Sequence, residues 1–485
     1  MRVGLCTSAV VWCTLGCGES NQTSPPPERG SAASPVADPA PTDPPAFPEG
    51  TRSLVLTRTV VVRFEPGEQA RGIGAIAVDT RVGWTRTATA KGCAKPWVEI
   101  TPRGWVCGDY LATSTKPILG REVPMLERGE LVPGIYGKVT VPNSVTYVLE
   151  KPKPARKPAK DKPQRPITSP AQIEPGPEPQ PKMVEGKPLV GSINVRQYEE
   201  LTIAGKTYWK VNQKQNEYVL RSAISPHRPS TYGGIRLGDE TGRVVPVGFV
   251  WSRHGGGNVY TTRKPRTGIA RQLAHKTPVT ILETASDKAG KLLAYRIGDD
   301  EWLDAADARV FHPAPPPPSL LPGERWIDID LENQILVAFE GDLAVYSTLI
   351  SSGTKDTPTD PGVYRMWLKQ SEADMNGLSG EDPYSVATVP WTQFFSPDKG
   401  LALHTAYWHD GFGTRRSHGC VNLAPRDARW LYFWSDPQVP AGWTSATGIT
   451  EAPGSIVRVR TKDDPAPPAK GYAKKVLEMR QAGRG

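Results

Sequence analysis

The chain has 485 residues, of which 50 are proline, 47 are glycine and only 38% are hydrophobic, so part of it must be unstructured connector. Its formal net charge is +9, but much of the Lys and Arg excess sits in Pro-rich tracts and not on a helix or an aromatic-studded face. This pattern argues against nucleic-acid binding and favours a solvated tract or attraction to an anionic polymer.

The N-terminal residues predict export. Residues 1–19 place one arginine before an apolar, small-residue run that is too short to span a bilayer and has the form of a signal peptide. The sequence TLGC at its end resembles a bacterial lipoprotein signal, in which Cys17 would become the lipidated first residue. A plain cleaved signal is the alternative. We expect an exported protein of the periplasm or cell envelope, held to a membrane only if Cys17 is lipidated.

Proline-rich breaks divide the remaining chain into predicted domains. We expect a disordered tether at 20–50, a Pro/Lys-rich linker at 151–188, a Pro-rich linker at 313–323 and a basic tail with a candidate helix at 462–485. Between these breaks, short alternating runs separated by Gly, Asp and Asn turns are typical of small β domains. The two predicted upstream β regions are 51–150 and 189–312.

The aromatic residues of these two regions follow a pattern. Aromatic pairs on strands are followed by turns and by apolar strand ends such as GWVCGDYL. This resembles the bacterial SH3-like barrels that accompany cell-wall enzymes, although such a likeness implies little about activity. The alternative is that each aromatic side chain only fills a core.

Three cysteines lie beyond the targeting segment. Cys93 and Cys107 lie in two Trp-bearing, strand-like runs joined by a Pro-Arg-Gly turn signal, which predicts a disulfide across a hairpin in an oxidising compartment. The alternative is a pair of buried thiols. Cys420 is then unpaired, and an unpaired thiol in an exported protein is a candidate reactive group.

The region 324–461 predicts a mostly β domain. Apolar residues alternate with acids up to Leu331, a turn follows at 333–334, and further strands are expected at 335–339 and 343–350. The stretch TKDTPTDPGVYRM then supplies turn chemistry and another strand. Helix signals appear only later, in APRDARWLYFW.

The stretch HTAYWHDGFGTRRSHGCVNL gathers three of the chain's seven histidines and Cys420. A cysteine attacks as its thiolate, and a free thiol with a pKa near 8.5 needs a neighbouring imidazole or helix N-terminus to lower that pKa. His418 lies two residues before Cys420, on the same face of a strand, and the helix predicted from Pro425 begins nearby. His404 can return beside Cys420 if the intervening residues form a loop. Gly419 leaves the backbone open to a substrate oxyanion.

This stretch has two other interpretations. His404, His409, His418 and Cys420 could bind a metal, but the tight paired spacings of structural zinc sites are absent. Core histidines around a buried structural thiol are a second alternative, although so polar and Gly-rich a run is a poor candidate for a core. We therefore expect a cysteine nucleophile, with no metal and no cofactor.

Residues 324–461 resemble the L,D-transpeptidase catalytic domain of the YkuD type. The family's signature is a histidine, a spacer, then Ser/Thr-His-Gly-Cys, a hydrophobic residue and Asn, here matched by His404, a spacer and SHGCVN at 417–422. Thr405 stands where many members carry Gly or Ser, and its carbonyl can still orient the imidazole. The resemblance covers under a third of the chain.

The fold class implied for the whole chain is mainly β. It comprises an L,D-transpeptidase-type β-sandwich catalytic domain with a short helix after the motif, preceded by small SH3-like β domains and Pro-rich linkers.

The resemblance also implies residue roles. Cys420 would attack the carbonyl between the L-centre of meso-diaminopimelate and the terminal D-alanine of a tetrapeptide stem. His404 would act as the base. The oxyanion would be held by His418, Gly419 and the Cys420 amide, and Ser417 would support the turn.

Further residues of the motif are candidates for substrate contact. Arg416 and Asn422 would shape the site and meet substrate carboxylates. Tyr407 and Trp408 would either contact substrate or, more often for such residues, pack a lid. His409 belongs to the loop and receives no role.

The implied function is peptidoglycan crosslinking in cell wall biogenesis, through a thioester that a diaminopimelate amine resolves. The same site could pass the acyl group to water, as an L,D-carboxypeptidase, or to a lysine of an outer-membrane protein. A non-enzymatic alternative is a wall-binding lipoprotein. Carbapenems are expected to acylate the same cysteine, and peptidoglycan stem peptides are the expected partners.

Overall fold

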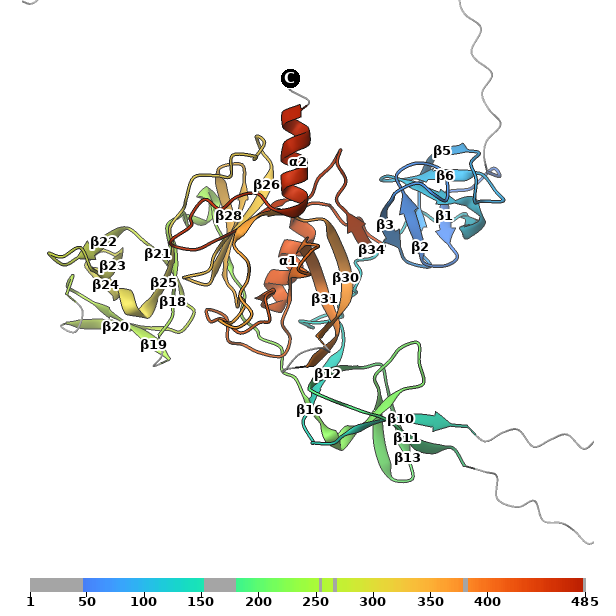
Figure 1. Cartoon of the computed structure of the whole chain (residues 1–485), viewed down its shortest axis with the longest axis horizontal. Helices are drawn as coiled ribbons and strands as arrows, with labels where there is room; N and C mark the ends of the chain where they lie inside the picture. The colour runs from blue at the N-terminus through green and yellow to red at the C-terminus, as the bar shows by residue number, and fades with distance from the viewer. Residues whose placement is uncertain (1–46, 152–179, 253–254, 265–267, 378–382, 483–485) are drawn as a thin grey trace, which may run out of the picture. The chain divides into compact units, whose positions relative to one another are not determined.

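The computed structural model describes residues 47–151, 180–252, 255–264, 268–377 and 383–482 (Figure 1). It is mainly β, with two α-helices in these ranges, as the sequence predicted. The predicted signal peptide with Cys17, most of the predicted tether and most of the predicted 151–188 linker lie outside the described residues. In the part that is described, no helix combines the length and the apolar character needed to cross a bilayer.

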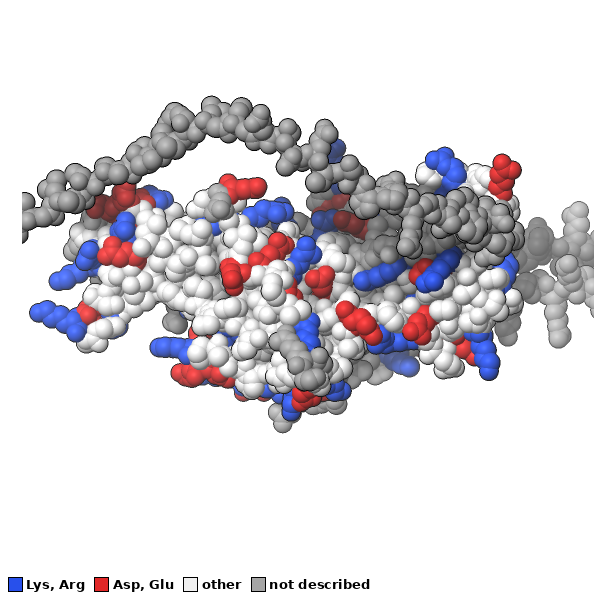
Figure 2. All heavy atoms as spheres, turned by 90° about the horizontal axis from the view of Figure 1, so that it is seen from above, with Lys and Arg blue, Asp and Glu red and all other residues white. Residues whose placement is uncertain are grey.

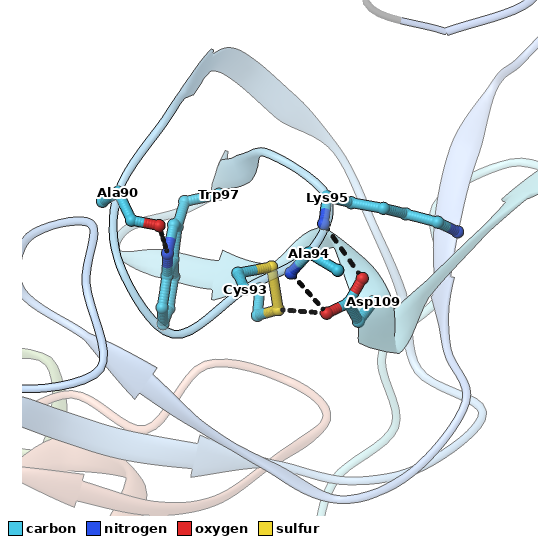
Figure 3. The surroundings of a disulfide bond; sticks show 7 residues. Ala90, Cys93, Ala94, Lys95, Trp97 and Asp109 are labelled. Carbon is cyan, nitrogen blue, oxygen red and sulfur yellow. Dashed lines mark hydrogen bonds between the residues drawn. A yellow bond between two sulfur atoms is a disulfide. The ribbon is translucent and has the colours of Figure 1, made fainter.

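The first group of strands carries the predicted disulfide. Its elements are β1 (Ser53–Leu56), β2 (Val60–Arg63), β3 (Gly72–Ile76), β4 (Arg81–Val82), β5 (Trp84–Ala88), β6 (Trp97–Ile100), β7 (Trp105–Cys107), the 3-10 turn η1 (Gly108–Tyr110) and β8 (Leu111–Ser114). Strands β6 and β7 form an antiparallel hairpin, and Cys93 bonds to Cys107 with their Cα atoms 5.6 Å apart (Figure 3). The Asp109 carboxylate accepts hydrogen bonds from the amides of Ala94, at 2.8 Å, and Lys95, at 3.0 Å. The disulfide prediction is confirmed.

The second group of strands joins chain segments on both sides of the predicted linker. Its elements are β9 (Ile135–Val139), β10 (Val145–Glu150), β11 (Lys182–Pro188), β12 (Ser192–Gln197), β13 (Glu199–Ile203), β14 (Lys206–Lys210), β15 (Tyr218–Leu220), η2 (Arg221–Ala223) and β16 (Ile224–Pro226). Strand β9 pairs with β12 and β16, while β10 pairs with β11 and β15. The predicted domain end at 150 therefore falls inside a paired unit, and β11 lies within the range predicted as linker. Local alternation marks strands but does not choose their partners.

The third group occupies the rest of the second upstream region. Its elements are β17 (Ile235–Arg236), η3 (Asp239–Thr241), β18 (Val247–Val250), β19 (Gly256–Tyr260), β20 (Ile269–Ala274), β21 (Pro278–Thr280), β22 (Glu283–Ser286), β23 (Leu292–Gly298), β24 (Glu301–Asp304), η4 (Ala305–Asp307) and β25 (Ala308–Phe311). Strand β18 lies between β21 and β25, and β19 to β24 form a second sheet without β21. These are small β units, and their SH3-like character stays a prediction.

The C-terminal region contains the motif. Its elements are β26 (Arg325–Asp330), β27 (Ile335–Glu340), β28 (Leu343–Leu349), β29 (Gly362–Arg365), β30 (Leu368–Gly377), β31 (Tyr384–Ser396), β32 (Leu401–Thr405), β33 (Val421–Leu423), α1 (Pro425–Trp434), β34 (Trp443–Thr447), β35 (Ile456–Arg460) and α2 (Gly471–Ala482). The predicted meander and the helix that begins at Pro425 are present. The candidate helix of the basic tail is α2.

Two sheets build this region around one core. One sheet has the order β17-β28-β27-β26-β35-β29, and the other continues through β31, β30 and β34, with β32 and β33 at its side. Apolar side chains of both sheets share a buried cluster, which includes Ile327, Leu336, Leu403 and Val421. Helix α1 adds Leu431 to this cluster and packs on β31 and β32 (Figure 1). The core therefore fixes β32, β33 and α1, which surround the motif.

The acids that alternate with apolar residues along β26 do not face solvent. Asp328 is fully buried and pairs with Arg458 at 2.7 Å and with Arg460 at 3.0 Å, both from the parallel neighbour β35. Each buried charge has a partner here, as burial requires.

The surface carries both signs of charge. Figure 2 shows Lys and Arg interspersed with Asp and Glu over the described part of one face. Exposed ion pairs such as Arg271 with Glu301, at 2.7 Å, are part of this mixture.

Candidate active site

The pairing of β32 with β33 brings the two ends of the motif together. These strands are parallel, with His404 opposite Asn422 and Leu403 opposite Val421. Cys420 directly precedes β33, so the same register places it beside Ala402 of β32. Residues two apart on a strand point the same way, so Ala402 and His404 share a face. Cys420 therefore lies on the face of His404. Cys420 and His404 both line one cavity of about 380 Å³. The loop between strands that the sequence required is therefore present.

The environment of Cys420 keeps its thiol protonated. The side chain is half-buried, and its Sγ lies 3.7 Å from the carbonyl oxygen of Gly400. Burial raises the pKa of Cys420 to about 11, and a hydrogen bond with the backbone of Ala402 opposes this only in part. We expected a lowered pKa. The structure gives the opposite sign because desolvation of the thiolate outweighs its neighbours.

His404 is placed as a neutral base. Its ring is buried, and Nδ1 lies 2.9 Å from the carbonyl oxygen of Thr405, so Nδ1 carries the hydrogen and Nε2 keeps its lone pair. Burial lowers the pKa of His404 to about 4, while the Thr405 carbonyl acts in the opposite direction. The orienting role predicted for that carbonyl is confirmed.

Ser417 shapes the turn that presents the cysteine. Its hydroxyl donates to the carbonyl oxygen of Cys420 and accepts from the amide of Gly419 at 3.1 Å. Gly419 has a φ of +123°, and a Cβ there would lie 3.1 Å from Leu401, so this position favours glycine. Because the Gly419 amide is engaged by Ser417, we expect the Cys420 amide to be the main backbone donor to an oxyanion.

A threonine-rich loop forms hydrogen bonds with the backbone of this turn. The buried hydroxyl of Thr359 donates to the carbonyl oxygen of Gly419 at 2.7 Å and accepts from the amide of Gly353 at 2.9 Å. Thr357 donates to the carbonyl oxygen of Ser417 at 3.1 Å. This loop is the TPTDPG segment quoted from the sequence.

His418 has a different setting from His404. Its ring is exposed and stacks on Tyr384 with the ring centroids 4.5 Å apart. Tyr384 is the first residue of β31, and it lines the cavity together with Val386 of the same strand.

His409 contacts the predicted site residue Asn422, a contact that the sequence did not reveal. The Gly411 amide donates to its Nδ1 at 3.1 Å, and burial lowers its pKa to about 4, so the ring is neutral and Nε2 carries the hydrogen. Nε2 lies 3.1 Å from the Asn422 side-chain amide. Two donors cannot bond each other, so the Asn422 oxygen faces His409. If the Asn422 amide is turned the other way, its buried side-chain oxygen has no hydrogen-bond partner among the described residues.

This arrangement directs the NH₂ of Asn422 into the cavity, which Asn422 lines. Both ring nitrogens of His409 are engaged, which does not suit a metal ligand. The sequence spacing carried no signal for this contact, because it depends on the path of the loop between β32 and β33.

Comparison with known proteins agrees with this geometry. Residues 324–459 match the family model of the YkuD L,D-transpeptidase catalytic domain. These residues form an L,D-transpeptidase catalytic domain.

The L,D-transpeptidase domain has named relatives. Over 121 residues, 22% of this chain, it is 30% identical to a putative L,D-transpeptidase, YciB, of Bacillus subtilis (strain 168), and this covers 59% of that protein. Over 110 residues, 21% of this chain, it is 31% identical to L,D-transpeptidase 2 of Mycobacterium tuberculosis (strain CDC 1551 / Oshkosh), and this covers 27% of that protein. The chain thus spans less than two thirds of either relative.

Among solved structures, the catalytic domain of an Enterococcus faecium L,D-transpeptidase is 26% identical. The match covers 28% of this chain and 98% of that one, with a TM-score of 0.22. An L,D-transpeptidase from Mycobacterium smegmatis is 17% identical over 49% of this chain and 89% of that one, with a TM-score of 0.23.

The L,D-transpeptidase domain brings most of the predicted site residues to one cavity. Those that line it are His404, Trp408, Arg416, Ser417, His418, Cys420 and Asn422. Tyr407, for which the sequence left substrate contact and packing open, does not line this cavity. Its side chain is fully buried, stacks on Tyr136 at 4.1 Å between ring centroids and donates to the carbonyl oxygen of Ala387 at 2.9 Å.

Proposed function

We propose that the L,D-transpeptidase domain transfers a peptidoglycan tetrapeptide stem to an acceptor amine through a thioester on Cys420. The observation that carries this proposal is the neutral His404 on the same face as Cys420, with both side chains open to one cavity. The matched family model supports the reaction class.

The first half-reaction follows from the protonation states. The Sγ of Cys420 attacks the peptide carbonyl as Nε2 of His404 takes the thiol proton, so the proton moves during the attack and not before it. The amide of Cys420, with His418 nearby, stabilises the oxyanion. The bond to D-alanine then breaks, its nitrogen takes the proton from His404, and a thioester remains.

The second half-reaction restores the enzyme. The side-chain amine of a second diaminopimelate attacks the thioester carbonyl, the bond to Sγ breaks, and the amine proton returns through His404 to the thiol. Water or a protein lysine in place of that amine would give a carboxypeptidase or a protein-wall linkage by the same steps.

The test is intact-protein mass spectrometry of residues 20–485 after incubation with a carbapenem, beside the Cys420→Ala variant. We expect one adduct that is absent from the variant. Incubation with tetrapeptide then separates crosslinked, hydrolysed and lysine-linked products. Failure of the folded chain to form any adduct would contradict the proposal.

We further propose that the protein acts in the periplasm or cell envelope, with Cys17 as a lipid anchor. The motivating observation is the form of residues 1–19. Fractionation of cells that make the full chain, beside a Cys17→Ala variant, tests this. We expect the variant to leave the membrane fraction, and equal membrane association of both chains would refute the anchor.

A further inference from the structure

The active-site cavity is completed by residues far upstream of the L,D-transpeptidase domain. Its lining includes Lys138, Ser192, Asn194 and His227 together with Cys420. Strand β12 pairs in parallel with β31, so the sheet of the catalytic domain continues into the second upstream group. The first of these residues precedes the cysteine by about 280 positions (420 − 138).

Strand register places three of these side chains on one face. Asn194 lies opposite Lys138 of β9, and Ser192 of β12 lies opposite Tyr384 of β31. Direct neighbours across a sheet, and residues two apart along a strand, point to the same side. Lys138, Asn194 and Ser192 therefore share a face with Tyr384, whose ring stacks on His418. These side chains line the same cavity as Cys420.

The amide of Asn194 is held in one orientation. Asn194 is buried, and its Oδ1 lies 2.7 Å from Nε2 of His227. Burial, followed by the charge of Lys138, lowers the pKa of His227 to about 4, so the ring is neutral and Nε2 donates to Oδ1. The NH₂ of Asn194 is thereby turned away from His227.

The chemistry of this face selects for negative charge. It offers an ammonium from Lys138, an amide NH₂ from Asn194 and a hydroxyl from Ser192, and Arg416 adds a guanidinium elsewhere in the cavity. No Asp or Glu is among the described residues that line this cavity. Ammonium and NH₂ groups bind carboxylates through charge-assisted hydrogen bonds.

We propose that Lys138, Asn194 and Ser192 form a subsite that binds a carboxylate of the peptide substrate while Cys420 attacks the scissile carbonyl. This proposal rests on the proposed function and extends it, because it makes the second upstream group a determinant of substrate choice. Three carboxylates of the stem share the required chemistry: that of its glutamate, the second one of diaminopimelate and that of the terminal D-alanine.

The subsite is tested by binding, without turnover. Isothermal titration calorimetry uses the full chain with Cys420→Ala and four synthetic tetrapeptides: one unmodified and three that are each amidated at one carboxylate, of glutamate, of diaminopimelate or of the terminal D-alanine. Adding Lys138→Met should raise the Kd of the unmodified peptide about three- to fivefold, the scale of an exposed ion pair. The peptide that lacks the contacting carboxylate should already bind weakly and should not respond to Lys138→Met, which identifies that carboxylate.

Lys206→Met is the matched control, because Lys206 is also exposed on a strand of this group but does not line the cavity. It should leave every Kd unchanged. Raising the salt concentration should weaken peptide binding to the parent chain more than to Lys138→Met.

The outcomes separate the two proposals. Equal Kd values for the parent and Lys138→Met, or no peptide binding at all, would overturn the subsite even if Cys420 forms its carbapenem adduct. The Kd in the Cys420→Ala chain could depend on Lys138 while the chain that keeps Cys420 forms no carbapenem adduct. That result would support the subsite and overturn the proposed function.

Discussion

The protonation of Cys420 offers the sharpest test of the site. A thiol with a pKa of about 11 is ionised in roughly one molecule in ten thousand at pH 7, against about 3% for a free cysteine. This is roughly a 300-fold difference in thiolate. A more basic thiolate is a better nucleophile. With a Brønsted slope of about 0.4–0.5, each thiolate of Cys420 should react roughly tenfold faster than that of free cysteine. Alkylation of Cys420 by iodoacetamide at pH 7 should therefore be about thirtyfold slower than that of free cysteine.

The assay follows the mass of residues 20–485 over time at fixed iodoacetamide. Cys420 is the free cysteine of the described residues, since Cys93 and Cys107 are bonded to each other. The alkylation rate should rise about tenfold per pH unit from pH 7 to 9.5. A rate that is constant above pH 6 and exceeds that of free cysteine would refute this reasoning, because it would reveal a preformed thiolate beside a charged His404.

Carbapenem acylation should behave differently, because His404 takes the proton during attack. The acylation rate should be lost as the pH falls through about 4, where the imidazole becomes protonated. The His404→Gln variant should abolish fast acylation yet leave the pH dependence of iodoacetamide alkylation unchanged.

Three further outcomes are expected. Thr359→Val leaves two buried backbone groups unpaired, so it should cost about 2–4 kcal/mol in urea unfolding and slow carbapenem acylation, and unchanged stability would contradict the buried contacts. His409→Leu should lower kcat/KM for the tetrapeptide about tenfold and His409→Gln, which keeps a donor for Asn422, should restore part of it. Replacing Cys93 and Cys107 by Ser opens a loop of 14 residues and should cost about 3 kcal/mol of stability, while the carbapenem adduct should still form.

Features that depend on neighbouring residues in the sequence could be predicted from the sequence. Pro425, which suits a first helical turn, marks the start of α1, and the turn signal between two Trp-bearing runs predicted the Cys93–Cys107 bond. The spacing of His404 and Cys420 implied two adjacent strands, and β32 and β33 are those strands.

Features set by tertiary packing were not predictable in this way. The sign of the Cys420 pKa shift depends on how deeply neighbouring chain buries the sulfur, which the motif does not encode. Strand β31 pairs with β12, and this pairing joins residues about 190 positions apart (384 − 192), a separation at which local alternation does not choose the partner strand. Without that pairing, Lys138 has no visible relation to the motif.

The β12–β31 pairing also has a consequence for how this protein can be divided into parts for experiments. The edge of β31 at Tyr384–Val386 is paired by β12, and β34 is paired on one side by β3. Excising 324–461 as a minimal domain would leave both edges with unpaired N–H and C=O groups, which template self-association. The upstream strands thus cover edges of the catalytic domain that could otherwise pair with another chain. Aggregation of the excised domain would therefore result from those exposed edges and would say nothing about the chemistry of Cys420.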